Sequence, residues 1–247
     1  MKGEPYLEAV KVTKFYQDVS ALDEVCLSVR PGEVVCLLGD NGAGKSTLLH
    51  ILSGVERADS GTVRISGADV RLGSPAEARE RGIATVFQDL AVVPIMPVYR
   101  NFFLGREPTV GWGPFQMFDK RKAIAITEGA LRDLGVSSAA VRLPIGTLSS
   151  GQRQGVAVAR ALYFGARILI LDEPTSALGV KQVERVLGYV RRAKEAGIGV
   201  ILVTHNVQHA YSIGDTFVVL FRGRSVGTFD KANLNEMQLT KMMAGII

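Results

Sequence analysis

The sequence predicts an α/β fold with an antiparallel β subdomain and an inserted α-helical subdomain, and three observations carry this prediction. Residues 33–38 are a nearly uninterrupted apolar run that ends at a glycine, which is typical of a strand covered on both faces. Segments 7–12 and 25–29 alternate apolar and polar residues, as half-buried antiparallel strands do. From about residue 91 to 148 the chain is first broken by prolines and then helical over 120–134, which indicates an insertion.

The remaining elements follow in chain order. We expect strands at 62–65, 83–87, 168–171 and 199–204, a hairpin of 217–221 with 225–229, and helices at 48–52, 156–163, 180–196 and 233–243. The prediction is one domain, residues 1–247. Its core with the β subdomain comprises 1–90 and 165–247, and the helical insertion comprises about 91–164. With 47% hydrophobic and 21% charged residues, the composition is that of a folded chain and excludes disordered and collagen-like classes.

Charge and cysteine content exclude little more. The chain has 29 basic and 24 acidic residues, a net charge of +5. A mildly positive surface does not by itself predict a nucleic-acid partner, and we expect none. Cys26 and Cys36 lie in apolar strand-like runs with no Cys or His at metal-ligand spacing, so we expect small core residues in a reducing compartment.

No segment has the pattern of a signal peptide or a membrane span. The chain start lacks an apolar stretch, and the longest uncharged window, 196–214, contains several polar side chains. A spanning helix needs about 20 mostly apolar residues. We therefore expect any membrane association to be peripheral.

The most specific motif is a glycine-rich turn between the buried strand at 33–38 and the helix that follows. It comprises Gly39, Asp40, Asn41, Gly42, Ala43, Gly44, Lys45, Ser46 and Thr47. Glycines let the backbone wrap around a triphosphate so that successive N–H groups point at its oxygens, and the helix dipole favours the same anion. Lys45 is expected to reach the β- and γ-phosphates, and the Ser46 hydroxyl to contact Mg²⁺. The alternative is that this is a glycine-rich turn that arose by chance. The position of the motif between a buried strand and a helix disfavours that alternative.

A second motif supplies carboxylates. The apolar strand at 168–171 delivers Asp172 and Glu173 at its carboxyl end, where ligands bind in open parallel sheets. Asp172 is expected to hold Mg²⁺, and Glu173 to orient and deprotonate the attacking water. The alternative is that Asp-Glu-Pro only ends the strand. It is disfavoured because the glycine-rich turn, hereafter the phosphate loop, is also present.

A third stretch, Leu148-Ser149-Ser150-Gly151-Gln152, precedes an apolar helix. Alone it would be an ordinary helix cap. In this order with the other two motifs, it makes the chain resemble the ATP-binding subunits of ABC transporters, over nearly its whole length. The resemblance implies a P-loop NTPase (RecA-like) core, with ATP and Mg²⁺ as ligands. It also implies that Ser149, Gly151 and Gln152 complete the ATP site of a partner subunit. Ser150 departs mildly, since glycine is commoner there.

The resemblance assigns three further residues. Gln88, at the end of a strand, matches the glutamine that contacts Mg²⁺ and the attacking water. His205, after the strand at 199–204, matches the histidine that contacts the γ-phosphate. Tyr16 matches the aromatic residue that stacks on adenine, although an isolated tyrosine is more often a core residue. His209 is expected to be structural.

One departure concerns the stretch Ser176-Ala177-Leu178-Gly179, where the family usually has aspartate in place of Gly179. That aspartate couples the two ATP sites of a dimer, so its absence puts the tightness of this coupling in doubt. Sugar importers of the ribose, xylose and fructose type often carry the glycine version. The segment 101–107 also looks like theirs. The chain has 42 residues after His205 (247 − 205), and we expect no appended regulatory domain.

The resemblance implies a motor ATPase that is coupled to transport of a monosaccharide, at the cytoplasmic face of the inner membrane. Expected partners are a second copy in a head-to-tail dimer, integral-membrane permease subunits and, indirectly, an extracytoplasmic sugar-binding protein. An ABC transporter for another substrate is the first alternative. A soluble relative that acts on nucleic acid or ribosomes is the second, and it is disfavoured because no long coiled coil or second ATPase half is present.

Overall fold

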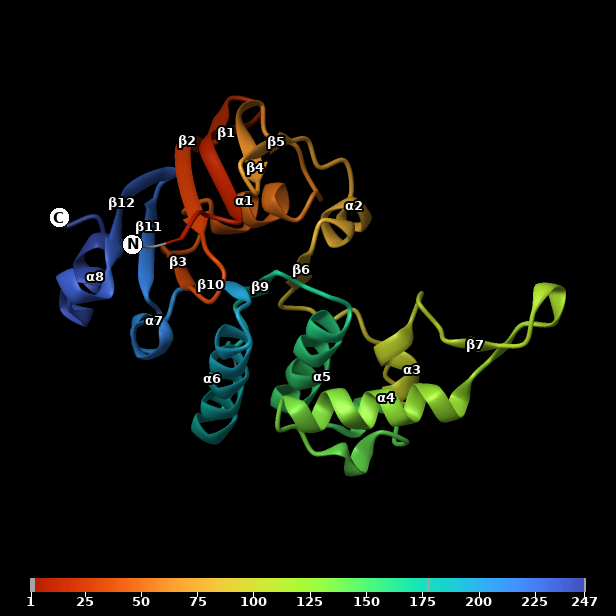
Figure 1. Ribbon diagram of the computed structural model, residues 1–247. Coiled ribbons are helices and arrows are strands. Elements are labelled where there is room, and N and C mark those ends of the chain that lie inside the picture. The colour runs from red at the N-terminus through yellow and green to blue at the C-terminus, as the bar shows by residue number, and fades with distance from the viewer. Residues whose placement is uncertain (1–2, 177, 247) are drawn as a thin grey trace. The chain divides into compact units, whose positions relative to one another are not determined.

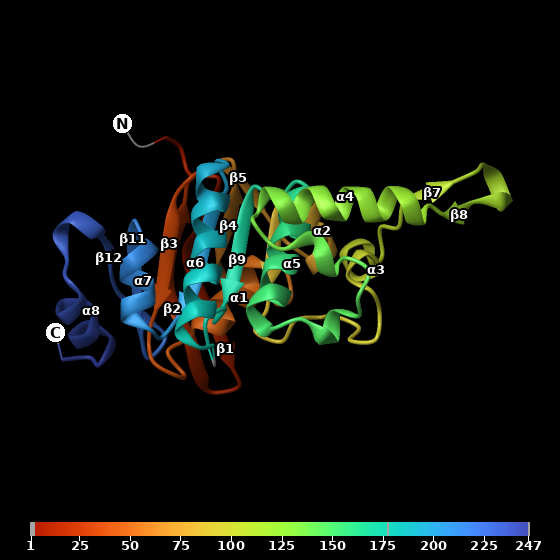
Figure 2. The same ribbon diagram turned by 90° about the horizontal axis from the view of Figure 1, so that it is seen from below.

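The computed structural model describes residues 3–176 and 178–246, apart from the side chain of Pro114. Figures 1 and 2 show the ribbon in two views. The described chain divides into two compact units. The first contains the residues up to Gln88, Gly165–Ser176 and the residues from Val190 onward; the second contains Asp89–Phe164 and the residues from 178 to Tyr189. The predicted boundaries of the helical insertion, 91–164, stay a prediction.

A six-stranded sheet organises the first unit, in the order β12-β11-β3-β10-β9-β6. Strands β11, β3, β10, β9 and β6 run parallel, and β12 pairs antiparallel with β11 at the edge. All five residues of β3 and all six of β10 are buried, as a strand covered on both faces requires. The strands are β3 (Val34–Leu38), β6 (Ile83–Val86), β9 (Ile168–Asp172), β10 (Gly199–Thr204), β11 (Thr216–Phe221) and β12 (Arg224–Asp230).

A four-stranded antiparallel sheet, in the order β2-β1-β4-β5, forms the β subdomain of the same unit. Its strands are β1 (Leu7–Tyr16), β2 (Val19–Val29), β4 (Ser60–Ile65) and β5 (Ala68–Val70). The alternation of buried and exposed residues along β2 keeps one face apolar.

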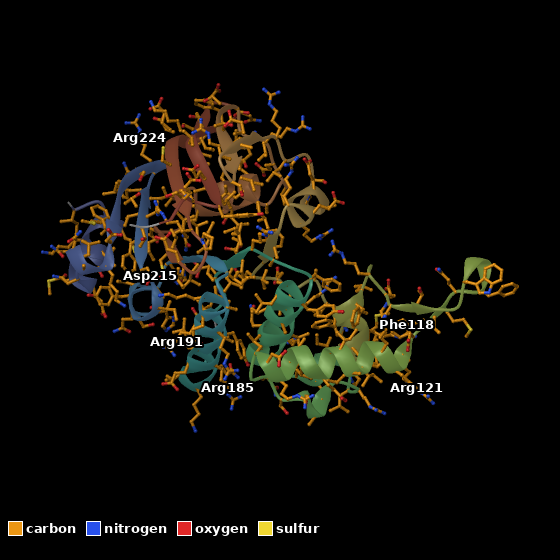
Figure 3. The ribbon with its side chains drawn as sticks, viewed as in Figure 1. Phe118, Arg121, Arg185, Arg191, Asp215 and Arg224 are labelled. Carbon is orange, nitrogen blue, oxygen red and sulfur yellow. The ribbon has the colours of Figure 1, made fainter. Side chains whose placement is uncertain are left out.

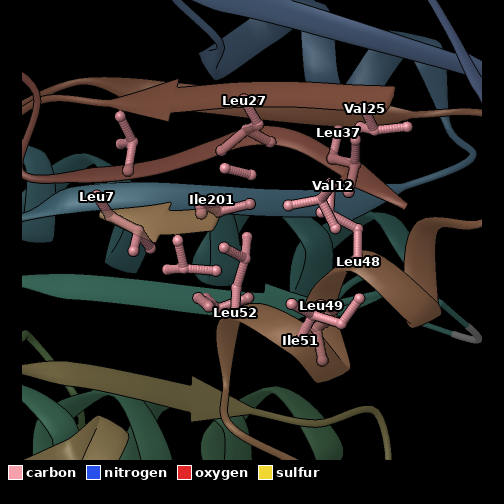
Figure 4. Close-up of a cluster of buried hydrophobic side chains, with 14 of the residues drawn as sticks. Leu7, Val12, Val25, Leu27, Leu37, Leu48, Leu49, Ile51, Leu52 and Ile201 are labelled. Atoms are coloured by element: carbon pink, nitrogen blue, oxygen red, sulfur yellow. The ribbon is translucent and has the colours of Figure 1, made fainter. Parts of the chain in front are cut away.

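Helix α1 (Lys45–Leu52) packs into the core of this unit. Leu48, Leu49 and Leu52 of α1 are at most 1% exposed and belong to a cluster with Leu7 of β1 and Leu37 of β3 (Figure 4). Burying such side chains stabilises the fold by about 1.5–3 kcal/mol each. The core therefore fixes the start of α1, and with it the glycine-rich turn, relative to the sheet.

The other helices of the first unit are short. They are α2 (Pro75–Glu80), α7 (Val207–Ile213) and α8 (Glu236–Met243), and the 3₁₀ turn η4 (Lys231–Asn233) precedes α8. Helix α6 (Val180–Glu195) has its residues up to 189 in the second unit and the rest in the first.

The second unit is mostly helical, with a small core of its own. Phe102 and Phe103 pack against Tyr163 and Phe164, with ring centroids 5.5 to 6.1 Å apart. The helices are α3 (Val98–Phe103), α4 (Lys120–Asp133) and α5 (Ser150–Tyr163), with the 3₁₀ turns η1 (Gly113–Phe115), η2 (Ser138–Ala140) and η3 (Ile145–Thr147). A two-stranded hairpin, β7 (Thr109–Val110) with β8 (Met117–Phe118), leads into α4.

The predicted α/β class and its antiparallel subdomain are confirmed, although several details differ. Strand β2 begins at Val19 instead of 25, and α5 begins at Ser150 instead of 156. Cys36 is buried as predicted, but Cys26 is exposed, because it lies between the inward-facing Val25 and Leu27 on β2. The last helix begins at Glu236 instead of 233, since Asn235 caps it. Short elements that leave little periodicity were missed: β5, β7, β8, α2, α3 and α7. No helix among the described residues is long and apolar enough to cross a bilayer.

Candidate functional site

The carboxyl ends of four parallel strands meet at one edge of the six-stranded sheet. Leu38 of β3 is level with Thr204 of β10, and Val203 of β10 is level with Asp172 of β9. Strand β6 pairs with β9 in parallel and ends at the same edge. The site residues that the sequence predicted in the first unit follow these strand ends. Tyr16 is the exception. Crevices at such edges are where α/β sheets bind ligands.

The turn after β3 is built for close backbone approach. A Cβ atom at Gly39 would lie 2.6 Å from the carbonyl oxygen of Leu220, so only glycine fits. Gly44 has φ +101°, and its Cβ would lie 2.6 Å from the carbonyl oxygen of Ala21. Gly44 is also the N-cap of α1 and offers no side chain to its first N–H groups. The start of α1 is therefore open to an anion.

Lys45 points back into this turn. Its ammonium donates to the carbonyl oxygens of Gly39, at 2.9 Å, and Asp40, at 3.0 Å. Burial lowers the pKa of Lys45, and the nearby carboxylates of Glu173, Asp40 and Asp172 oppose that shift. The positive charge is thus held in the concave turn with carboxylates around it. The other predicted loop residues complete the turn and the first turn of α1: Asn41, Gly42, Ala43, Ser46 and Thr47.

Asp172 is the last residue of β9 and lies close to Lys45. Burial raises the pKa of Asp172, and the neighbouring Glu173 raises it further, against the influence of His50 and Lys45. A half-buried carboxylate beside a like charge is stabilised by a cation. The predicted donors Ser46, Gln88 and Asp172 are all hard oxygen ligands with one carboxylate, which suits Mg²⁺. No group of three or more His, Cys, Asp or Glu residues in the described chain is arranged to hold a metal.

Glu173 is held in place through both its backbone and its side chain. Its backbone lies in the left-handed region, with φ +45°, a conformation that costs a non-glycine residue free energy. Its N–H donates to the carbonyl oxygen of Val203 at 2.9 Å, and the Ser176 hydroxyl donates to its carbonyl oxygen at 2.8 Å. The Thr204 hydroxyl donates to Oε2 at 3.2 Å. These bonds fix the direction in which the carboxylate points.

His205 completes a pair with this carboxylate. Its Nδ1 lies 2.8 Å from Oε1 of Glu173, while the histidine side chain is 55% exposed and the glutamate 13% exposed. A fixed carboxylate therefore lies beside an accessible imidazole. His209, expected to be structural, lies with its Nδ1 3.0 Å from the Thr175 hydroxyl, and burial lowers its pKa.

Gln88 and Tyr16 lie at the margins of this edge. Gln88 is exposed, two residues beyond the end of β6. Tyr16 ends β1 with 44% of its surface exposed, and its phenol donates to Glu56. Burial and this bond raise the pKa of Tyr16, and a hydrogen bond with Thr47 lowers it. Tyr16 is therefore not a core residue, and its phenol lies beside Thr47 in the first turn of α1.

The serine-rich turn lies on the second unit. Ser149 is the N-cap of α5: its hydroxyl accepts from the Gln152 N–H at 3.4 Å, and its own N–H donates to Oε1 of Gln152 at 2.9 Å. This capping box satisfies two N–H groups at the helix start. Gly151 is buried, and a Cβ there would lie 3.5 Å from Gln182. The cap interpretation and the nucleotide interpretation are compatible, because both need a serine at this helix end.

On the first unit, the structure thus brings together Lys45, Asp172, Glu173 and His205. Tyr16 lies beside Thr47 on the same unit. The Ser149 turn belongs to the second unit. Two supporting residues were missed by sequence reasoning. Thr204 directly precedes His205 at the end of a strand, so its position in the sequence could have indicated that it lies at the site. No such indication existed for Glu56, because 40 residues separate it from Tyr16.

Comparison with protein families and curated proteins identifies relatives. Residues 22–176 match the family model described as ABC transporter. The chain is 42% identical to the xylose/arabinose import ATP-binding protein of Sulfolobus acidocaldarius, over 96% of this chain and 93% of that protein. It is 37% identical to the fructose import ATP-binding protein of Rhizobium meliloti, over 99% and 96% respectively. A ribose import ATP-binding protein of Burkholderia ambifaria is 38% identical over 98% of this chain, which spans 47% of that protein.

Solved structures give the same picture for the fold. A nucleotide-free ATP-binding cassette from an ABC transporter superposes with a TM-score of 0.84 at 25% identity, covering 98% of this chain and 97% of that one. A dimeric bacterial ABC transporter cassette superposes with a TM-score of 0.75 at 25% identity, covering 92% and 100%. The predicted P-loop NTPase core is confirmed by these neighbours.

Proposed function

The chain belongs to the ABC transporter family of ATP-binding proteins, and from this premise we propose that it is the ATP-hydrolysing motor subunit of a membrane importer for a monosaccharide. The observation that carries the catalytic part is the meeting of Lys45, Asp172 and the Glu173–His205 pair at one sheet edge. The sugar is inferred from relatives named for xylose/arabinose, fructose and ribose import.

The proposed reaction is transfer of the γ-phosphoryl group of ATP to water. Glu173 accepts the proton of the attacking water, because its carboxylate is aimed by Thr204 and its backbone is anchored to β10. His205 lies beside the same carboxylate. We assign to it the contact with the γ-phosphate. Catalysis of this kind consists of positioning and charge stabilisation, so rigid placement of the base matters more than its intrinsic basicity.

The phosphates bind at the glycine-rich turn. Lys45 exchanges its bonds with the carbonyl oxygens of Gly39 and Asp40 for phosphate oxygens, and the open N–H groups of α1 add to the anion site. Ser46, Gln88 and Asp172 would hold Mg²⁺, and the bound cation would offset the phosphate charge. Tyr16 stacks on adenine, and the bond from its phenol to Glu56 restrains the ring.

A second copy completes each site in this proposal. The phosphate loop of one chain and the turn at Ser149, Gly151 and Gln152 of the other enclose one ATP, so a symmetric head-to-tail dimer holds two. A dimeric neighbour among the solved structures supports this arrangement. Permease subunits, and through them an extracytoplasmic sugar-binding protein, are the further partners, and the chain works at the cytoplasmic face of the inner membrane.

Sugar uptake in a host that lacks this chain tests the function. Wild-type protein should restore uptake of one labelled sugar from a panel of xylose, arabinose, ribose and fructose. Lys45→Ala should not restore it, and should weaken ATP binding by about tenfold or more, because a charge-assisted bond is lost. Lys241→Ala removes an exposed cation on α8, away from the residues assigned to the site, and should behave as wild type. Full restoration by Lys45→Ala would contradict the motor assignment.

A further inference from the structure

The β7–β8 hairpin of the second unit carries an unusual concentration of exposed apolar side chains. In Figures 1 and 2 it extends beyond the ends of α3 and α4. Trp112 is 83% exposed, Phe115 79%, Met117 72% and Val110 57%. Val110 and Met117 are a cross-strand pair, so they share one face of the ribbon. Scattered apolar residues on a surface are ordinary, whereas four on one short hairpin mark a contact surface.

The base of the hairpin is anchored. Phe118 stacks on Tyr99 of α3, with ring centroids 6.2 Å apart and planes 14° apart, and the Arg100 guanidinium lies 4.9 Å from the Phe118 ring centroid. The Asp119 N–H donates to the carbonyl oxygen of Pro108 at 2.8 Å, which closes the ladder. The exposed tip is therefore presented by a fixed stem.

Charge is arranged around this tip in a definite way. Residues 108–118 carry no charged side chain at all. The flanking residues out to 100 and 122 contain five cations against two carboxylates, Glu107 and Asp119. The cations are all exposed: Arg100, Arg106, Lys120, Arg121 and Lys122. Figure 3 labels Phe118 at the stem and Arg121 at the adjoining end of α4.

The cations at the start of α4 also line a hollow. An open pocket of about 460 Å³ is bounded by Lys120, Arg121 and Arg142, with Ile124, Ala125 and Glu128 completing it. Three cations against one carboxylate favour an anion there. A phosphate-bearing headgroup complements this charge, and the hairpin stem that leads into α4 connects the charge with the apolar tip.

We propose that the β7–β8 hairpin inserts its apolar tip into the surface of a bilayer that contains anionic lipid, while the cations at its base bind the lipid headgroups. Tryptophan, an apolar ring with one polar N–H, favours the membrane–water interface, and flanking lysine and arginine add attraction to anionic lipid. An amphipathic element of this kind lies about 5–10 Å into the headgroup region. The contact needs neither ATP nor a permease.

A bilayer fits the observations better than a protein partner does. A protein surface that covered an uncharged tip and five surrounding cations would need an apolar pocket ringed by acidic groups. An anionic bilayer offers an apolar interior beneath a negative surface everywhere, and so complements the whole hairpin. A permease or a second copy as the occupant is therefore an outcome that the experiment must be able to reveal.

Trp112 is the only tryptophan of the chain, so its fluorescence reports the tip alone. Full-length protein without nucleotide is mixed with vesicles of phosphatidylcholine containing phosphatidylglycerol, and with vesicles of phosphatidylcholine alone. We expect a blue shift and co-sedimentation with the anionic vesicles, and quenching by lipids brominated near the headgroup end of the acyl chain. An unshifted spectrum with anionic vesicles would overturn the proposal.

A matched pair of variants separates the tip from general apolar exposure. Met117→Ser on the hairpin and Met237→Ser on α8 each remove a methionine, 72% and 69% exposed respectively. Met117→Ser, and likewise Phe115→Ser, should weaken vesicle binding about tenfold, because the lost side chain no longer leaves water. Met237→Ser should bind as wild type. Equal weakening by Met117→Ser and Met237→Ser would show non-specific adsorption and overturn the proposal.

Charge variants test the headgroup part. Lys120→Gln should weaken binding to anionic vesicles about fivefold, whereas Lys241→Gln on α8 should not change it. High salt should weaken wild-type binding and shrink the difference between the two variants.

Because none of these residues belongs to the ATP site, ATPase activity in solution should be unchanged, so failure of this proposal is distinguishable from failure of the motor assignment. If Phe115→Ser blocks assembly with the detergent-solubilised permease while vesicle binding is unaffected, the tip contacts protein and the proposal is wrong.

Discussion

At the scale of single residues, the site depends on groups whose charge is constrained by burial and by neighbours. Lys45 is a cation whose pKa is lowered by burial, and Asp172 is a carboxylate whose pKa is raised by burial. Glu173 adopts a left-handed backbone that only its surroundings maintain. Such strain is characteristic of positions kept for function instead of stability.

Glu173→Gln tests the proposed base. Glutamine keeps the size of the side chain and can still bond to Thr204 and His205, but it does not accept a proton from water. ATP binding should therefore persist, while hydrolysis falls by about a hundredfold or more. Phosphate release and nucleotide binding are measured on the same preparation. Glu195→Gln, an exposed position on α6, should hydrolyse ATP at the wild-type rate, and turnover by Glu173→Gln within twofold of it would contradict the assignment.

Asp172→Asn tests the electrostatic cost of this site. Because burial and Glu173 raise the pKa of Asp172 in the folded chain, ionised Asp172 destabilises the folded state relative to the unfolded chain at pH values above about 4. Asp172→Asn should then raise the unfolding temperature of the nucleotide-free protein at pH 7, by about 2–4 °C per kcal/mol. The gain should shrink as the pH falls to about 4. Asp18→Asn, at an exposed turn, is the control, and a Tm gain for Asp172→Asn that does not vary with pH would refute this explanation.

At the scale of elements, α5 shows how closely packing and function share residues. Its N-cap serine and Gln152 satisfy each other's N–H groups, while Gly155 in the next turn is buried against other elements of the second unit. A Cβ at Gly155 would lie 2.7 Å from Val136 Cγ2 and 2.8 Å from Tyr189 Cε2. The glycine is needed here for close approach, despite its low helix propensity.

Gly155→Ala and Gly129→Ala form a matched pair of helix substitutions. The first should destabilise the fold by about 1–3 kcal/mol, because the added methyl group overpacks the interface. The second, in α4 with no atom within 4 Å of the new Cβ, should stabilise it by about 0.5–1 kcal/mol. Urea unfolding gives both values. If both substitutions increased the free energy of unfolding, the packing at Gly155 would be looser than the structure indicates.

At the scale of the whole molecule, the motor proposal depends on residues that lie in two different units of the chain. The phosphate loop belongs to the first unit and the Ser149 turn to the second. In the dimer that we propose, each site draws one of them from each copy, so neither copy holds a complete site. In that dimer, Gly179 replaces the aspartate that is usual in the family and would affect the coupling between the two ATP sites. Ala177 of the same stretch lies outside the described residues.

Mixing two inactive variants tests this shared site. Lys45→Ala disables the phosphate loop, and Ser149→Asp keeps a capping side chain but places a negative charge near the γ-phosphate. Each homodimer should be inactive. A mixed dimer contains one site with two intact halves, so an equimolar mixture should recover roughly a quarter of wild-type ATPase activity if the sites act independently. No recovery in dimers shown to exchange subunits would mean that one chain builds the whole site.

The sequence by itself determined the strands that deliver the motifs and the motifs' order, because period-two and apolar patterns and glycine spacing express local backbone requirements. Lys45, Asp172 and Glu173 could be placed at strand ends on these grounds, and the family that they indicated is confirmed. Their individual catalytic roles stay predictions.

Only the tertiary structure decided which residues distant in sequence touch. It joined Glu173 to His205 across 32 residues, tied Tyr16 to Glu56 across 40, and turned Cys26 to the surface although its neighbours are buried. It also left Trp112 and its hairpin without a core to cover them. The physical reason is the same in each case: burial and side-chain contact depend on the packing of whole elements, and no local pattern encodes that packing.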